Sequence, residues 1–142
     1  MLMAIDAGAT HSSFALFVDP ERPLRSGSCR GFNYSLHGRS GLEELFGVVF
    51  GALAEGGGEP PRPPIVGLAV AGAGRPDARV RALRDLAAVR DRIVPDAGVY
   101  LFHDGESALY RALGGGVGVV VSAGTGSIGY GRRADGAEAR VG

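Results

Sequence analysis

Short segments at the beginning of the chain have the apolar and polar pattern of strands. Leu2 to Ile5 form an apolar run, Ser13 to Val18 form a second strand-like segment, and Leu24 to Arg30 form a weaker third. Residues 19–23, rich in proline and charge, separate the second segment from the third. This arrangement predicts three strands in an antiparallel meander.

The clearest helical pattern covers Ser40 to Ala54. Ser40 and Glu43 match a capping box, and the three glycines at 56–58 are expected to end the helix. The apolar residues recur at the spacing of one broad helical stripe: Leu42, Leu45, Phe46, Val49, Phe50 and Leu53. We therefore expect this helix to cover one face of a sheet.

The central part of the chain alternates strands with helices. Residues 65–71 and 99–102 are nearly continuous apolar runs, which is typical of buried strands in a parallel sheet. Residues 76–93 and 107–113 predict the helices that follow these strands. In the longer helix we expect the following residues to face the core: Val80, Leu83, Leu86, Ala87 and Ile93.

The last part of the chain predicts the beginning of a second unit. Residues 117–122 and 127–131 flank a glycine-rich turn and predict a β-hairpin with no third strand. We therefore expect a first domain over residues 1–115 and the start of another over residues 116–142. A lone hairpin is marginal in water. Its apolar residues are thus expected to be partly exposed or covered by another molecule: Val117, Val119, Val121 and Ile128.

Composition and charge narrow the classes of function. The 142 residues carry 15 basic and 15 acidic side chains, so no excess charge favours nucleic acid or a membrane as a partner. All 15 basic side chains are arginines, which excludes a Walker phosphate loop or a Schiff-base lysine in this chain. The single cysteine, Cys29, excludes an internal disulfide or zinc site. The first residues have no signal-peptide pattern, so we expect a cytoplasmic protein.

The first candidate for chemistry is the segment Asp6-Ala7-Gly8-Ala9-Thr10-His11-Ser12. Its small residues let backbone N–H groups approach a phosphate closely, and Thr10 and Ser12 add hydroxyl groups. Asp6 would then lie below the phosphates and hold hydrated magnesium. An ordinary hairpin turn with a surface aspartate would explain the same pattern.

Two further segments complete the set of candidates. Residues 119–127 place a Gly-Thr-Gly turn between two strands, either to hold phosphates from the opposite side or as a plain hairpin. His103 and Asp104 stand where a buried strand ends and a helix begins. A carboxylate at that edge of an α/β sheet lies where ligands bind, and it could act as a general base. The alternative is that Asp104 caps the helix.

In this order, the three segments resemble the actin–hexokinase superfamily, whose two related domains bind ATP between such hairpins. Residues 104–108 and 118–127 are similar to N-acetylglucosamine kinases and BadF/BadG/BcrA/BcrD-type ATPases, as is the Gly31-Phe32-Asn33 loop. The resemblance covers nearly the whole chain. It implies an α/β fold of the ribonuclease-H-like, actin-like ATPase type: a mixed sheet with helices on both faces, followed by the first hairpin of a second such domain.

The resemblance also implies ATP and Mg²⁺ as cofactors and an amino sugar as the small-molecule partner. The residues that it implies at the ATP phosphates are Gly8, Ala9, Thr10, Gly124, Thr125 and Gly126. The residues that it implies at the sugar are Asn33, Asp104, Ser127 and Ile128. Asp104 would be the catalytic base, and Asp6 would hold magnesium through water. Two departures bear on the sugar: His11 follows Thr10 in place of Lys or Arg, and Ile128 replaces a frequent polar residue.

The implied reaction is transfer of the ATP γ-phosphoryl group to a hydroxyl of N-acetylglucosamine or glucosamine. The chain would be the N-terminal part of this kinase and inactive alone. One alternative is an ATPase that activates a partner enzyme, although such activators share a cluster held by cysteines of two subunits, and Cys29 stands alone. The other alternative is a non-catalytic fragment. Whether the protein forms a homodimer stays open.

Overall fold

The computed structural model describes residues 1–54, 59–123 and 127–142. The first unit contains, in chain order, β1 (Leu2–Ala7), β2 (His11–Asp19), β3 (Arg22–Arg30), α1 (Tyr34–Leu53), β4 (Ile65–Val70), α2 (Pro76–Ile93), β5 (Gly98–His103) and α3 (Asp104–Leu113). The second contains β6 (Gly118–Ala123), β7 (Ser127–Arg132) and β8 (Glu138–Val141). The predicted sequence of strands and helices is confirmed, apart from the ends of α1 and α3 and the additional strand β8.

The first five strands form a mixed sheet in the order β3-β2-β1-β4-β5. The meander β1-β2-β3 is antiparallel, as predicted, and β4 and β5 add to β1 in parallel. The register places Asp6 beside Ser13 on β2 and Ala69 on β4, and Ala69 beside Phe102 on β5. Because side chains alternate along a strand, these residues share one face of the sheet.

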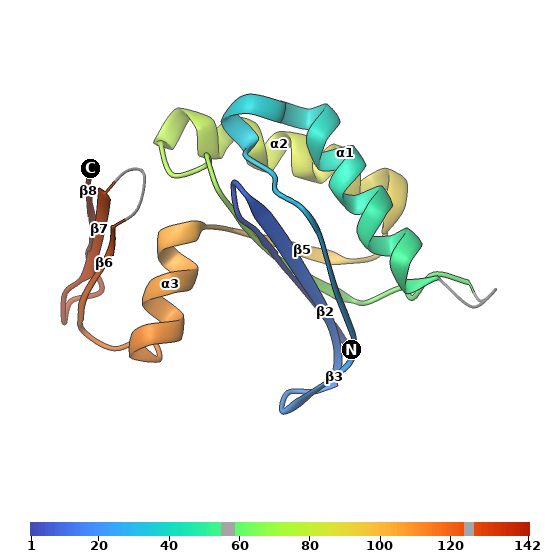
Figure 1. The fold of residues 1–142 in the computed structure, drawn as a ribbon, viewed down its shortest axis with the longest axis horizontal. Helices are drawn as coiled ribbons and strands as arrows, with labels where there is room; N and C mark the ends of the chain where they lie inside the picture. The colour runs from blue at the N-terminus through green and yellow to red at the C-terminus, as the bar shows by residue number, and fades with distance from the viewer. Residues whose placement is uncertain (55–58, 124–126) are drawn as a thin grey trace.

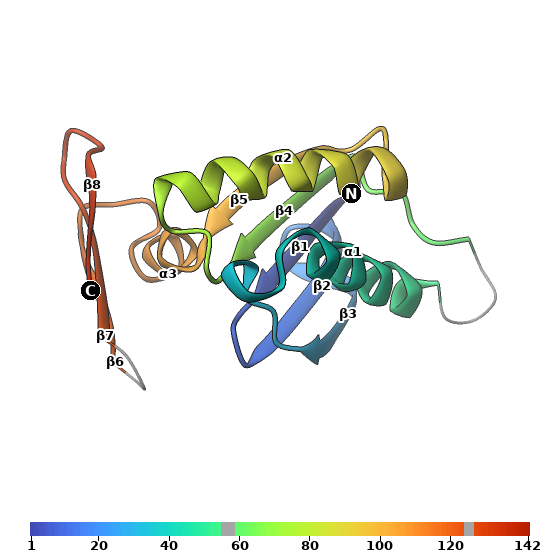
Figure 2. The ribbon, with the colours of Figure 1, turned by 90° about the horizontal axis from the view of Figure 1, so that it is seen from above.

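Two helices cover the other face of this sheet. Figures 1 and 2 show α1 and α2 side by side over it, while α3 lies on the opposite side. Met3, Val66 and Leu68 point from the strands toward α1 and α2 and are fully buried. Every residue of the predicted α1 stripe is buried beneath the helix, with Phe46 and Val49 at 0% exposure. Burial of this size is the main favourable contribution to folding.

The first helix begins earlier than its capping pattern predicts. Asn33 is the N-cap, and its Oδ1 accepts a hydrogen bond from the Ser35 N–H at 3.0 Å. Gly38 then interrupts the helix with φ 53° and ψ −148°, a conformation that favours glycine. The Ser40 hydroxyl donates to the His37 carbonyl at 3.1 Å, so the predicted capping box at Ser40 is wrong. The glycines at 56–58 lie outside the described residues.

The buried side of α2 also differs from the prediction. Val80 and Leu83 are 68% and 45% exposed, so the expectation that they face the core is wrong. The buried residues are Ala78, Ala82, Leu86 and Val89. Two alanines in this set let α2 approach its neighbours closely, because short side chains reduce the distance between packed helices. A count of large apolar residues does not detect such a stripe.

The face of the sheet opposite α1 and α2 is largely uncovered in the described residues. Leu2, Ile65, Tyr100 and Phe102 lie on it and are 39–56% exposed. Among the helices that the structure describes, α3 alone approaches this side, at the end where β5 stops (Figure 1). The Asp6 side chain is therefore exposed to solvent on this face.

The second unit is a three-stranded antiparallel sheet in the order β6-β7-β8. The predicted hairpin is confirmed, but the expectation that no third strand joins it is wrong. The strand β8 was missed because its sequence, Glu-Ala-Arg-Val, has little apolar pattern. Val117, Val119 and Val121 are 63–70% exposed, as predicted, and Ile128 is half-buried. In the described part of the chain, no helix is long and apolar enough to cross a membrane.

Candidate functional site at the joint between the two sheets

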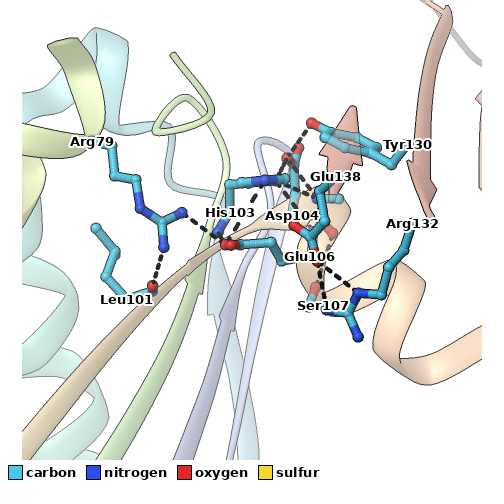
Figure 3. A network of polar contacts seen from close by, with 10 residues as sticks. Arg79, Leu101, His103, Asp104, Glu106, Ser107, Tyr130, Arg132 and Glu138 are labelled. Atoms are coloured by element: carbon cyan, nitrogen blue, oxygen red, sulfur yellow. Dashed lines mark hydrogen bonds and ion pairs between the residues drawn. The ribbon is translucent and has the colours of Figure 1, made fainter. Parts of the chain in front are cut away.

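Asp104 stands at the joint between the two sheets. It is the first residue of α3, directly after β5, and its side chain is 52% exposed. Its Oδ1 accepts hydrogen bonds from the Gly105 N–H at 3.0 Å and from the Tyr130 hydroxyl at 3.1 Å. Figure 3 shows the carboxylate between the end of β5 and the small sheet. One oxygen is thus held by both units, and the carboxylate still reaches solvent.

His103, rather than Asp104, caps α3. Its Nδ1 accepts hydrogen bonds from the N–H groups of Gly105 and Glu106, at 3.1 and 3.2 Å, and the Glu106 carboxylate accepts from the His103 N–H at 2.8 Å. This is a reciprocal capping box. Sequence reasoning missed it because histidine is not among the usual cap residues. The alternative explanation of Asp104 as the cap of this helix is therefore wrong, and its carboxylate is available for another role.

Arg79 ties the capping box to the core sheet. Its guanidinium donates to Glu106 at 2.8 Å and to the Leu101 carbonyl at 3.3 Å, as Figure 3 shows. Burial alone would raise the pKa of Glu106, but the bonds from Arg79 and the His103 N–H outweigh it, so the pKa is lowered. Glu106 is therefore ionised at neutral pH, and it holds α2, β5 and α3 together behind Asp104.

Tyr130 on β7 packs the small sheet against the end of β5 and the start of α3. It is 5% exposed, and its ring stacks on His103 with centroids 4.8 Å apart. A Cβ atom at Gly105 would overlap the Tyr130 ring, so glycine is required there. Desolvation, followed by the negative charge of Asp104, raises the pKa of Tyr130. Its hydroxyl therefore stays protonated and can donate the hydrogen bond to Asp104. Sequence reasoning missed Tyr130, because only the folded chain brings β7 to Asp104.

A large cavity lies on the uncovered face of the five-stranded sheet, and we call it the sheet-face cavity. Its volume is about 950 Å³, and its polar lining includes Asp6, Ser13, Asp104, Ser107 and Arg111. Asp6 and Asp104 thus open into the same space. Sequence reasoning did not select Ser13, although its antiparallel pairing with Asp6 would have indicated it. The sequence had selected Ser12 instead, but Ser12 is fully buried toward the helices and cannot reach a phosphate in this space.

A second cavity lies between α2 and the small sheet, and we call it the joint cavity. Its volume is about 410 Å³. The residues that line it are Ser35, Gly72, Gly74, Arg75, Asp77, Ala78, Arg81, Asp104, Ile128, Tyr130 and Arg140. Asp104 is the residue common to both linings. Ser35 and Arg140 were not selected from the sequence, since neither belongs to a recognisable motif.

The turn between β1 and β2 carries Gly8, Ala9 and Thr10 at the edge of the sheet. A Cβ atom at Gly8 would lie 2.8 Å from the His11 carbonyl oxygen, so this tight turn requires glycine. The Phe32 N–H donates to the Gly8 carbonyl at 2.9 Å and holds the turn against the loop before α1. Ala9 and Thr10 are exposed. A fixed turn of small residues is the kind of backbone that phosphates approach.

The other predicted site residues are only partly brought together. Ile128 lines the joint cavity and Ser127 is exposed at the start of β7. Asn33 does not line this cavity; it caps α1 and touches Gly72, which does. The predicted phosphate residues Gly124, Thr125 and Gly126 lie outside the described residues.

Oxygen ligands near Asp6 fit a magnesium ion, which prefers carboxylates, hydroxyls and water. The exposed Asp6 carboxylate and its neighbour Ser13 supply such atoms on one face. A different group, His103, Glu106 and Glu138, has ligand atoms within 4.8 Å of one another. However, Glu106 already binds Arg79, and Glu138 binds Arg132. That group is therefore better explained as structural.

The folded chain resembles solved structures of two candidate kinases. No family model and no curated protein matches its sequence. A candidate N-acetylglucosamine kinase from Chromobacterium violaceum matches 98% of the chain with a TM-score of 0.73 and 23% identity. Another from Porphyromonas gingivalis matches 92% with a TM-score of 0.71 and 18% identity. The chain covers 47% and 44% of their lengths, so it spans about half of each.

At these identities the likeness establishes the fold. The chain has the ribonuclease-H-like fold of actin-like ATPase domains, as the sequence predicts, and a separate three-stranded sheet follows it. More narrowly, it shares the fold of about half of each of the two structures matched above. The BadF-type family name is not established by these matches.

Proposed function

We propose that this chain forms the part of an ATP-dependent sugar kinase that carries the catalytic base. The observation that supports this proposal is the position of Asp104, which lines both the sheet-face cavity and the joint cavity. A base for phosphoryl transfer must contact the acceptor hydroxyl on one side and lie close to the transferred phosphate on the other. A residue shared by two cavities satisfies both conditions.

In this proposal the joint cavity takes the sugar and Asp104 accepts the proton of its hydroxyl. The Tyr130 hydroxyl and the Gly105 N–H hold one carboxylate oxygen, which leaves the other for the acceptor. Ser127, Ile128 and Asn33 would contact the sugar, the last from the rim beside Gly72. The acceptor expected from the resemblance is N-acetylglucosamine or glucosamine, and the two matched kinases support this choice.

ATP would place its phosphates at the turn formed by Gly8, Ala9 and Thr10, above the sheet-face cavity. Asp6 would hold magnesium through water, next to Ser13. The ion, when bound, neutralises charge on the phosphates. The described residues contribute a fixed turn, two carboxylates and a cavity that both of them line.

The decisive experiment is Asp104→Asn in the complete gene product that contains these 142 residues, called the complete protein below. Its use matters because the matched structures are about twice as long, and closure of two domains completes such sites. We expect kcat for sugar-dependent ADP release to fall about 100-fold or more, the range for a positioned acid–base group. The KM for ATP should change little.

Asp96→Asn is the matched control, because Asp96 is an exposed aspartate between α2 and β5 and lines neither of the two cavities. This variant should keep full activity. If Asp104→Asn also keeps near-normal kcat, Asp104 is not the base. If the wild-type protein releases ADP at the same rate with and without any sugar, the protein is an ATPase of another kind.

A further inference from the structure

The joint cavity carries more positive charge than a neutral sugar needs. Three arginines line it: Arg75, Arg81 and Arg140. Arg81 donates to Asp77, another lining residue, at 3.0 Å, so these two charges neutralise each other. Among the residues that the structure describes, Arg75 and Arg140 form no ion pair with a carboxylate within 4.0 Å. Asp104 is the remaining acid of the lining.

The two arginines approach the cavity from different units. Arg140 lies on β8, opposite Tyr130 in the register, and both residues line the joint cavity. Arg75 precedes α2 in extended conformation. Between them is Gly74, where a Cβ atom would come no closer than 3.7 Å to the Tyr130 hydroxyl and 3.8 Å to the Arg140 Nε. These are ordinary van der Waals distances, so Gly74 lies next to Arg140 in the wall of the joint cavity, which the proposed base Asp104 also lines.

Guanidinium groups bind planar carboxylates and phosphates with two parallel hydrogen bonds, which a neutral hydroxyl cannot accept in the same way. Asp104 carries a single negative charge, so it can balance at most one of these two arginines. We infer that the acceptor of this site is an anionic sugar, one that carries a carboxylate or a phosphate group facing Arg75 and Arg140. This inference rests on the proposed function of the joint cavity.

The test compares matched sugars on the complete protein. Isothermal calorimetry would measure binding of N-acetylglucosamine, of N-acetylmuramic acid, which adds a carboxylate, and of N-acetylglucosamine 1-phosphate, which adds a phosphate. We expect at least one anionic sugar to bind about tenfold more tightly than the neutral one. The preference should shrink at high salt, because exposed charges are screened. The anionic sugar that binds more tightly shows whether the site prefers a carboxylate or a phosphate group.

Variants then assign the preference to the arginines. Arg75→Gln should reduce the ratio of the anionic-sugar affinity to the N-acetylglucosamine affinity severalfold, because it removes a guanidinium that faces the anionic group. Arg140→Gln should reduce the preference for the anionic sugar more than Arg75→Gln does. The control is Arg133→Gln, because Arg133 is exposed between β7 and β8, pairs with Asp135 and lines neither cavity.

The outcomes separate this inference from the function on which it rests. If N-acetylglucosamine is phosphorylated and binds as tightly as both anionic sugars, the inference is wrong and the sugar kinase stands. A preference for the anions that survives both arginine variants also overturns it. If no sugar binds or is phosphorylated, the proposed function fails as well.

Discussion

The two sheets of this protein differ in how far their apolar side chains are buried. In the five-stranded sheet, one face is sealed by α1 and α2, and Met3, Val66 and Leu68 are fully buried. In the three-stranded sheet, Val121 and Val141 flank Gly129 on a face that is open to solvent, and both are about 70% exposed. The first sheet can therefore stabilise itself, whereas the second depends on what it packs against.

The small sheet nevertheless packs directly against the proposed site. Its most buried large side chain, Tyr130, packs on Gly105 and His103 and donates to Asp104. Stability and site geometry are thus divided between the units: the large sheet supplies the free energy of folding, and the small sheet supplies contacts at one carboxylate. Four substitutions test this division, in order of decreasing expected effect.

Leu68→Ala should have the largest effect on stability. Leu68 lies on β4 in the middle of the large sheet and is 0% exposed. Its truncation should lower the free energy of unfolding by about 2–5 kcal/mol, through lost burial and the cavity left behind. Urea denaturation followed by circular dichroism measures it. A loss below about 1 kcal/mol would mean that the large sheet is not the stabilising unit.

Gly105→Ala should damage the site without damaging the large sheet. The added methyl group overlaps the Tyr130 ring, so the small sheet must move away from Asp104. We expect kcat of the complete protein to fall at least about tenfold, while alanine in a helix costs no stability relative to glycine. Gly47→Ala is the control, because a Cβ atom there meets nothing within 4 Å. Normal kcat in Gly105→Ala would show that the Tyr130 contact is dispensable.

Tyr130→Phe should have a smaller effect on the same contact. The ring and its packing remain, and only the hydroxyl that donates to Asp104 is removed. We expect kcat to fall about three- to tenfold, which corresponds to the roughly 0.5–1.5 kcal/mol that a typical hydrogen bond contributes. The KM for ATP should stay the same. Tyr110→Phe, at a tyrosine that is 64% exposed, should change neither constant. A kcat loss equal in both variants would refute the positioning role.

The strands of the large sheet could be predicted because their burial leaves a simple pattern in the sequence. The runs at 2–5 and 65–71 supply the buried side chains on the face that α1 and α2 cover, such as Met3, Val66 and Leu68. The inward side of α2 could not be predicted, since its contacts use Ala78 and Ala82 rather than the larger Val80 and Leu83. Close packing between elements is decided in three dimensions and leaves little trace in periodicity.

Some residues of the candidate site could likewise be predicted from the sequence, and others could not. Asp104 and Asp6 could be found from the sequence, because Asp6 lies near the end of β1 and Asp104 directly follows β5, at the same edge of the sheet. The partners of Asp104 could not, since Tyr130 follows it by 26 positions and meets it only through the packing of the small sheet. Ser12 was selected wrongly because alternation on β2 turns it toward the helices and turns Ser13 toward Asp6.

Val121→Thr should have the smallest effect, and its matched partner is Val66→Thr. Threonine keeps the branched shape of valine and adds a hydroxyl, so the pair compares the two sheets by polarity alone. At Val66, which is 0% exposed, the buried hydroxyl should cost about 1–3 kcal/mol of unfolding free energy. At Val121, which is 69% exposed, the change should stay within about 0.5 kcal/mol in the 142-residue chain. The same pair measured in the complete protein sharpens the comparison. If the cost at Val121 rises there toward that at Val66, another part of that protein covers the valine face of the small sheet, whereas an unchanged cost would show that this face stays open to water.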